Sequence, residues 1–157
     1  MRAFLRLELR RTDGGLITVR EAHNSVLRGG AGLLANMFAM KSTGITHMAV
    51  GSSDAPESQD FATTALTNAT EVTISPDAFQ IDPPDPVKRV VRVRVQGTVP
   101  AALNLGTVRE AGLVAHNGDT ASLYNRVVFA PIDKAADHEL TLFWEVGFPF
   151  GDLQWLL

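Results

Sequence analysis

Apolar and polar side chains alternate along several short segments of this chain, and this pattern limits the possible folds more than any other sequence feature. Because neighbouring side chains of a β-strand point to opposite faces, alternation predicts strands with one buried face. Leu142, Trp144 and Val146 share one parity, for example, whereas Thr141 and Glu145 take the other. Clusters of Gly, Pro, Asn and Asp separate eight predicted strands, at residues 3–9, 16–23, 45–50, 72–74, 87–95, 108–115, 123–129 and 139–148.

One segment has helical periodicity instead. Its apolar residues recur at a spacing of three to four, namely Leu33, Leu34, Met37 and Phe38. Such spacing places them on one face of a helix. Asn24 or Ser25 is a suitable N-cap residue, but three glycines within residues 29–32 weaken the first turn. We therefore expect the helix to begin late and to lie near residues 30–41.

The connections between the later strands exclude a parallel α/β fold. Parallel neighbours need crossovers of a dozen or more residues, usually helical, whereas residues 117–120 leave room only for a tight turn. We predict an all-β fold, an antiparallel β-sandwich of about eight strands with one inserted α-helix. A length of 157 residues favours one domain over 1–157, with 148–157 as an apolar C-terminal tail.

Composition removes several classes of function. The chain has no cysteine, so disulfides, thiolate nucleophiles and cysteine-ligated zinc are excluded. Its net charge of −3 gives no overall positive field to attract nucleic acid or anionic lipid. Charges interrupt the apolar residues of 1–11, so we expect neither a secretion signal nor a membrane segment.

The search for chemical motifs predicts no catalytic residue, no cofactor site and no metal site. Residues 51–53 lack the second glycine of a nucleophile elbow, and residues 29–32 lack the Gly-Lys-Ser/Thr ending of a phosphate loop. Distant strands can assemble a metal site, but no two histidines have the sequence spacing of a metal-ligand pair. We therefore expect His23, His47, His116 and His138 to be isolated structural histidines.

Two charged groups have structural interpretations. Glu110 and Arg126 lie in consecutive predicted strands, so they can meet across a strand pair and fix its register; an acid/arginine catalytic pair is the alternative. The basic stripe Lys88, Arg89, Arg92 and Arg94 lacks interleaved aromatic residues. It therefore predicts a solvated or interface face matched to acidic groups of a neighbour, not a nucleic-acid site.

The segment 148–157 is apolar where chain ends are usually polar. Such a segment either packs on its own core or contacts another subunit. We expect a subunit contact, with packing on its own core as the alternative. The candidate interface residues are Phe148, Phe150, Leu153, Trp155, Leu156 and Leu157.

The order of these features resembles a class of small β-rich structural proteins of tailed bacteriophages and phage-tail-like contractile particles. The resemblance spans residues 24–148 and rests on Asn24 with the Gly-rich helix 30–40, the strand and turn 45–52, and the segments 64–66, 108–113, 123–126 and 139–146. The sequence departs from a complete tail fibre in having no Gly-repeat or coiled-coil shaft.

The resemblance implies a virion or particle protein without enzymatic activity, assembled in the host cytoplasm. It would be a tail, collar, baseplate-peripheral or fibre-adaptor subunit whose partners are further copies in a symmetric homo-oligomer and other tail structural proteins.

Two other classes of function stay open. A carbohydrate-binding β-sandwich adhesin would expose aromatic residues on one face or loop, although most aromatic residues here have core-facing parity. A small hydrolase would need a cleft that joins His47 or His138 to a carboxylate.

Overall fold

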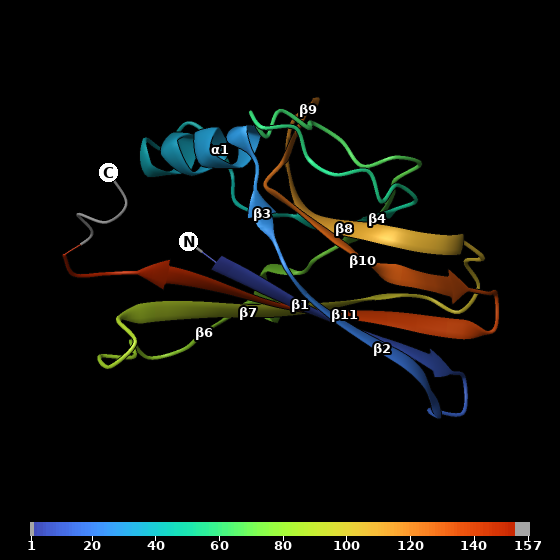
Figure 1. Ribbon diagram of the computed structural model, residues 1–157. Helices are drawn as coiled ribbons and strands as arrows, with labels where there is room; N and C mark the ends of the chain where they lie inside the picture. The colour runs from blue at the N-terminus through green and yellow to red at the C-terminus, as the bar shows by residue number, and fades with distance from the viewer. Residues whose placement is uncertain (1, 153–157) are drawn as a thin grey trace.

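The structure is a computed structural model that describes residues 2–152 and the side chains from Ala3 onward. Two antiparallel sheets pack face to face, and one helix lies outside them (Figure 1). The predicted all-β sandwich with a single helix is confirmed. Within residues 2–152, no helix has the length and apolar character needed to cross a membrane.

The first sheet has five strands. Their order is β2 (Leu16–His23), β1 (Arg2–Arg11), β11 (His138–Pro149), β7 (Val90–Val99) and β6 (Gln80–Ile81). The register places Leu5 of β1 and Val95 of β7 on either side of Trp144 in β11. All three side chains point into the sandwich and are buried.

The second sheet has six strands. Its order is β3 (Ser25–Val26), β10 (Asn125–Lys134), β8 (Gly106–Asn117), β4 (His47–Gly51) and β5 (Thr70–Thr73), and β9 (Thr120–Leu123) also pairs with β8. Tyr124 separates β9 from β10 while its N–H still donates to the Leu113 carbonyl, at 2.8 Å. The eight predicted strands correspond to β1, β2, β4, β5, β7, β8, β10 and β11, and the short β3, β6 and β9 are additional.

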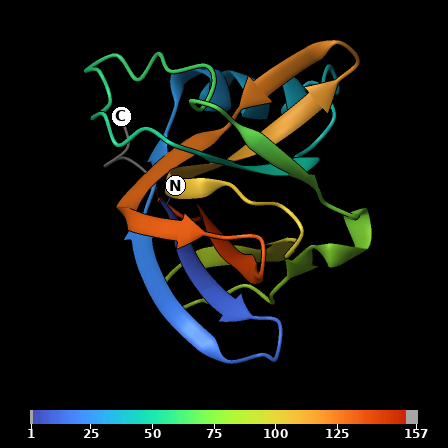
Figure 2. The same ribbon diagram turned by 90° about the vertical axis from the view of Figure 1, so that its right-hand side faces the viewer.

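The inner faces of both sheets form the main core, which includes Trp144 from the first sheet and Leu113 from the second. A second, smaller cluster covers the outer face of the second sheet, beneath the helix and a long loop (Figures 1 and 2). It consists of Leu27, Ala49, Leu66, Val114 and Leu123. Strands β4 and β8 are therefore covered on both faces.

The helix α1 (Arg28–Phe38) begins two residues earlier and ends three residues earlier than predicted. The expected side-chain caps are wrong. Leu27 occupies the N-cap position without a side-chain hydrogen bond, Ser25 belongs to β3, and Asn24 Oδ1 accepts the backbone N–H of Ala3 instead, at 2.8 Å.

Contact with the second sheet explains the early helix start. The N–H of Leu27 donates to the Tyr124 carbonyl at 3.1 Å, and a Cβ atom at position 30 would overlap that same carbonyl group. Gly30 thus permits a close approach of α1 to the sheet. The glycines that weaken the first turn in isolation are compensated by this packing.

Strand β7 begins at Val90, not at residue 87 as predicted. Asp85 Oδ1 accepts the backbone N–H groups of Val87 and Lys88, at 3.0 and 2.9 Å, and Arg89 has a φ of 54°. These residues form a turn, and the Val87 side chain is 89% exposed. Local hydrogen bonding by Asp85 therefore overrides the strand pattern.

Candidate functional site

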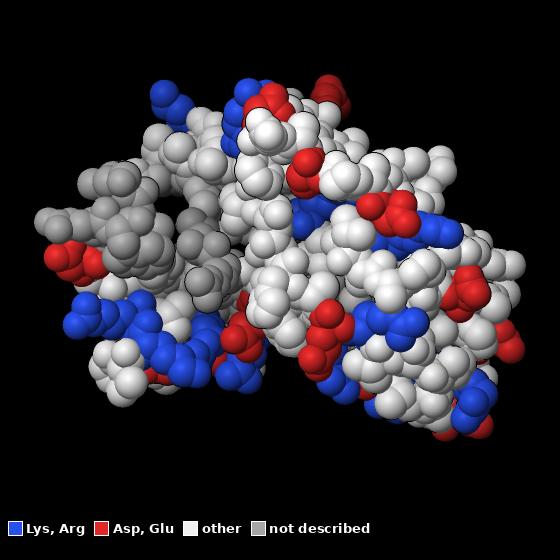
Figure 3. Space-filling view, viewed as in Figure 1, with Lys and Arg blue, Asp and Glu red and all other residues white. Residues whose placement is uncertain are grey.

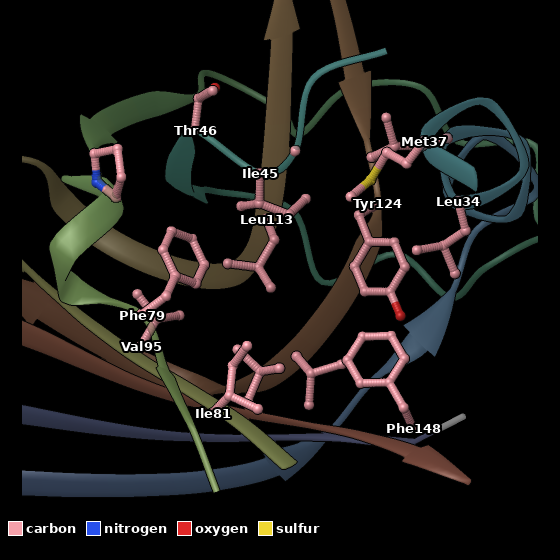
Figure 4. A pocket seen from close by; sticks show the side chains of 15 residues that line it. Leu34, Met37, Ile45, Thr46, Phe79, Ile81, Val95, Leu113, Tyr124 and Phe148 are labelled. Carbon is pink, nitrogen blue, oxygen red and sulfur yellow. The ribbon is translucent and has the colours of Figure 1, made fainter. Parts of the chain in front are cut away.

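A cavity of about 490 Å³ opens between the two sheets beneath α1. Among its 15 lining residues, Thr46 and Tyr124 are the only ones with polar side-chain atoms. Figure 4 shows Tyr124 and Phe148 lying beneath Leu34 and Met37, with Phe79 on the other side. A lining of this kind suits apolar side chains of a ligand or partner.

Each wall of the cavity comes from a different part of the fold. Leu34 and Met37 belong to α1, and Phe148 belongs to β11 in the first sheet. Phe79 and Ile81 come from the segment around the short helix η1 (Pro76–Ala78) and β6. The cavity therefore requires the finished sandwich, because no single segment of the sequence contains it.

Tyr124 is the lining residue with a titratable group. Burial raises the pKa of its phenol to about 12, because a phenolate would be poorly solvated in this apolar environment. The cavity accordingly disfavours charge, and its electrostatics agree with its apolar lining.

Large apolar side chains are also exposed at the cavity and at positions that follow a lining residue in the sequence. Ile81 lines the cavity and is 70% exposed. Phe38 and Met40, which follow the lining residue Met37, are each 93% exposed. Exposed apolar side chains of this kind could contribute to an interaction surface where they lie together.

The predicted interface residues are only partly within the described chain. Phe148 lines the cavity and packs against the main core. Phe150 is 38% exposed, and its N–H donates to the carbonyl of Arg89 at 2.9 Å. The remaining candidates lie outside the described residues, namely Leu153, Trp155, Leu156 and Leu157.

Glu110 on β8 and Arg126 on β10 form a buried ion pair, with Arg126 Nε donating to Glu110 Oε1 at 2.8 Å. Their residues are 1% and 6% exposed. Glu110 stands directly opposite Val128, so Arg126 contacts it as a diagonal neighbour across the strand pair.

The same pair holds the loop 52–69 in place. Arg126 Nη1 donates to Glu57 Oε1 at 2.8 Å, and its Nη2 donates to the Ser53 carbonyl at 3.2 Å. Glu110 Oε2 accepts the N–H groups of Ser53 and Thr67, at 2.9 and 3.0 Å. Both side chains thus bind the loop as well as each other, an arrangement that agrees with the structural interpretation of the pair.

Opposing effects act on the guanidinium of this network. Burial alone would lower the pKa of Arg126, but the hydrogen bonds that it donates to Glu110 and Glu57 outweigh this effect and raise the pKa. Arg126 therefore stays charged, as a buried ion pair requires.

Lys134 is a second buried cation, at 0% exposure. Burial lowers the pKa of its ammonium group, a property shared by some catalytic lysines. Its Nζ donates to the carbonyls of Ala101, Leu103 and Ala135, so all three protons are used within the fold.

The basic stripe is matched mainly within the chain. Arg94 pairs with Asp82 at 2.7 Å, and Arg92 pairs with Glu145 at 3.2 Å and with Asp85 at 3.6 Å. Figure 3 shows acidic and basic side chains interspersed over this view of the surface. For Arg92 and Arg94, acidic partners are thus supplied by this chain itself and not by a neighbour.

The histidines are less isolated than predicted. His23 packs beside Phe4, with ring centroids 5.6 Å apart, and His138 accepts the N–H of Ala135 at 3.4 Å. The rings of His47 and His116, however, lie only 4.4 Å apart. The expectation of scattered single histidines is therefore wrong for this pair, because strand pairing brings together residues that are distant in sequence.

No family model matches this chain, and neither the curated proteins nor the solved structures include one that is detectably similar to it.

Proposed function

We propose that this protein is a non-enzymatic structural subunit of a tailed bacteriophage or phage-tail-like contractile particle. In this proposal, its apolar cavity receives an apolar segment from a neighbouring copy. The cavity is the observation that supports assembly, whereas the class of particle rests on the resemblance described above. A peripheral tail, collar, baseplate or fibre-adaptor position, reached by assembly in the host cytoplasm, is part of the same proposal.

The occupant we propose is the part of segment 148–157 that follows β11, contributed by a second copy, because Phe148 itself lines the cavity of its own chain. Apart from Asp152, this segment carries no charged side chain. Five of the residues after β11 are large and apolar, namely Phe150, Leu153, Trp155, Leu156 and Leu157. Their character matches the apolar lining of the cavity, and side chains of this kind dominate the buried centres of protein interfaces.

The exposed residues support binding by a second copy over packing of the segment on its own chain. Phe38 and Met40 are each 93% exposed, which leaves apolar surface beyond the cavity itself. A neighbouring subunit could cover this surface while its segment fills the cavity. Repeated around an axis, one such contact per copy gives a closed ring.

The proposal is tested by the oligomeric state of the full chain. Light scattering coupled to size exclusion should show a multimer for the full chain and a monomer after truncation behind Gly151. Ile81→Asp should also produce monomers, because it places a charge at the edge of the cavity. Val87→Asp is the matched control, since Val87 is 89% exposed and lies outside the cavity lining.

Thermal unfolding separates this proposal from its alternative. If the segment binds a second copy, monomeric Ile81→Asp protein should still unfold cooperatively. A monomeric full chain whose melting temperature falls on truncation would contradict the proposal, because the segment would then serve its own core.

The class of particle has a separate test. Genes for sheath, tube or baseplate proteins beside the gene for this chain would support it. Genes of unrelated metabolism on both sides would contradict the particle assignment without affecting the assembly experiment.

The carbohydrate-binding alternative has less support from the aromatic residues. Sugar sites commonly use several exposed aromatic rings, but Trp144 and Tyr124 are 1% and 3% exposed, which leaves Phe38, at 93%, as the most exposed aromatic ring among the described residues. Binding of the isolated protein to a glycan array would favour this alternative.

A further inference from the structure

Three potential metal ligands meet on the outer face of the second sheet. The strands β8, β4 and β5 are consecutive neighbours in this sheet, and they carry His116, His47 and Glu71, respectively. In the register, His47 stands opposite Val114 of β8 and Thr73 of β5. His116 and Glu71 are each two residues from those partners, so both are diagonal neighbours of His47 on the same face.

The three side chains are close enough to share an ion. One ligand atom from each lies within 4.8 Å of the others, and His116 Nε2 is 2.6 Å from Glu71 Oε2. A zinc ion holds nitrogen and oxygen ligands at about 2.0–2.2 Å, so ligand atoms on one ion can be at most about 4.4 Å apart. Small rotations of the side chains would complete such a site.

The surroundings orient one of the imidazoles. Thr46 Oγ1 lies 2.7 Å from His47 Nδ1 and accepts the backbone N–H of His116 at 3.0 Å. A hydrogen bond to one imidazole nitrogen fixes the ring and leaves the other nitrogen for the metal, as is usual for ligating histidines. Thr46 therefore contacts the ring of His47 and the backbone of His116, and so links the two histidines.

The site is open to solvent on one side. The side chains of His116 and Glu71 are each 35% exposed, and His47 is half-buried. An ion can thus reach the site without unfolding of the sheet. Water could occupy the remaining coordination positions, as in zinc sites with three protein ligands.

We propose that His47, Glu71 and His116 bind one divalent transition metal ion, with zinc as the representative ion. Two imidazoles and one carboxylate suit zinc and its neighbours in the first transition series, whereas magnesium and calcium prefer oxygen ligands. The three ligands lie outside the cavity lining, although Thr46, which contacts His47, is part of that lining; metal binding is tested separately from the proposed assembly contact. Binding would link β5 to β4 and β8 and thereby stabilise the edge of the sheet.

Calorimetric titration of the chelator-treated full chain with zinc chloride tests the proposal. We expect one zinc ion per chain and a higher melting temperature in its presence. His47→Gln and His116→Gln should each weaken zinc binding at least tenfold, since each removes one ligand. His23→Gln and His138→Gln are matched controls that should leave zinc binding unchanged.

Cobalt(II) provides an independent readout, because its visible absorption reports the ligand geometry. The visible spectrum of cobalt(II) should change when the ion is added to the unmodified chain or to either control variant. It should stay unchanged when the ion is added to His47→Gln. Circular dichroism of the metal-free variants verifies that each is folded. Failure of the folded, unmodified chain to bind zinc, or zinc binding by His47→Gln and His116→Gln as tight as that of the unmodified chain, would overturn the proposal and leave a simple His116–Glu71 hydrogen bond.

Discussion

Gly30 of α1 lies so close to the Tyr124 backbone that a methyl group at position 30 would overlap the Tyr124 carbonyl oxygen. The N–H of Leu27 donates to this same carbonyl. One peptide group of the second sheet therefore determines both where the helix begins and how closely it packs. Since Leu33, Leu34 and Met37 of this helix line the cavity, the contact also sets the cavity width.

We expect Gly30→Ala to destabilise the protein by about 1–3 kcal/mol, the usual range for overpacking at a rigid contact. Gly32→Ala is the matched control, because a Cβ there meets no atom within 4 Å. It should stabilise the protein by about 0.5–1 kcal/mol, since alanine loses less backbone entropy in a helix. Urea unfolding of both variants measures the difference, and equal effects would contradict the packing argument.

Arg126→Met should be among the most destabilising single substitutions. It leaves the Glu110 carboxylate buried without its cation, for which a loss of about 3–5 kcal/mol is typical. Proteolytic cleavage within the loop 52–69 should also become faster. Arg109→Met is the control, because Arg109 lies 3.9 Å from Asp54 in a partly exposed pair and should change stability by less than about 1 kcal/mol. Similar losses in the two variants would contradict a special role for the buried pair.

The phenol of Tyr124 should titrate near pH 12 in the folded protein, because burial raises its pKa to about 12 from a usual 10.0. The folded state favours the protonated phenol, and the resulting stabilisation is fully present below pH 10 and is lost as the pH rises towards 12. Tyr124 is the only tyrosine in the chain, so ultraviolet absorbance of the phenolate reports it directly. Titration near pH 10 both with and without denaturant would show that the phenol is solvated in the folded state.

Acid should reduce the stabilising effect of Glu8. The hydrogen bond from Arg10 lowers the pKa of the Glu8 carboxyl below its usual 4.5, so the folded state favours the carboxylate. This contribution is present above about pH 4.5 and disappears as the pH falls through the lowered pKa. The stability difference between the unmodified protein and Glu8→Gln should therefore shrink between pH 7 and pH 3 in urea unfolding. A difference independent of pH would exclude this linkage.

Strand periodicity was sufficient to predict the sandwich because each long strand has a buried face. In β11, Leu142, Trp144 and Val146 all point into the core, as their parity predicts. The turn at Asp85 and the start of α1 could not be predicted in this way. Both depend on particular hydrogen bonds and contacts, including the one between Gly30 and Tyr124.

The candidate sites were much harder to predict than the fold. Glu110 and Arg126 lie in consecutive strands, and so their contact follows from local pairing. His47, Glu71 and His116 come from three strands whose order in the sheet is not evident in the sequence. The cavity likewise depends on how α1 packs over the sheets. Spacing along the chain carries no signal for either arrangement.

The lateral edges of the two sheets limit how copies can associate. Along the main strand order, β3 and β6 have two residues each and β5 has four, so they offer few unpaired N–H and C=O groups to an incoming strand. The longer β2 is tied to β10 through Arg20, which donates to the Ala130 and Pro131 carbonyls, each at 3.2 Å. Short or tethered edges discourage open-ended β-sheet growth. These edges therefore disfavour fibrils, and the assembly proposed above would have to form through contacts between side chains and not by addition of strands to a sheet.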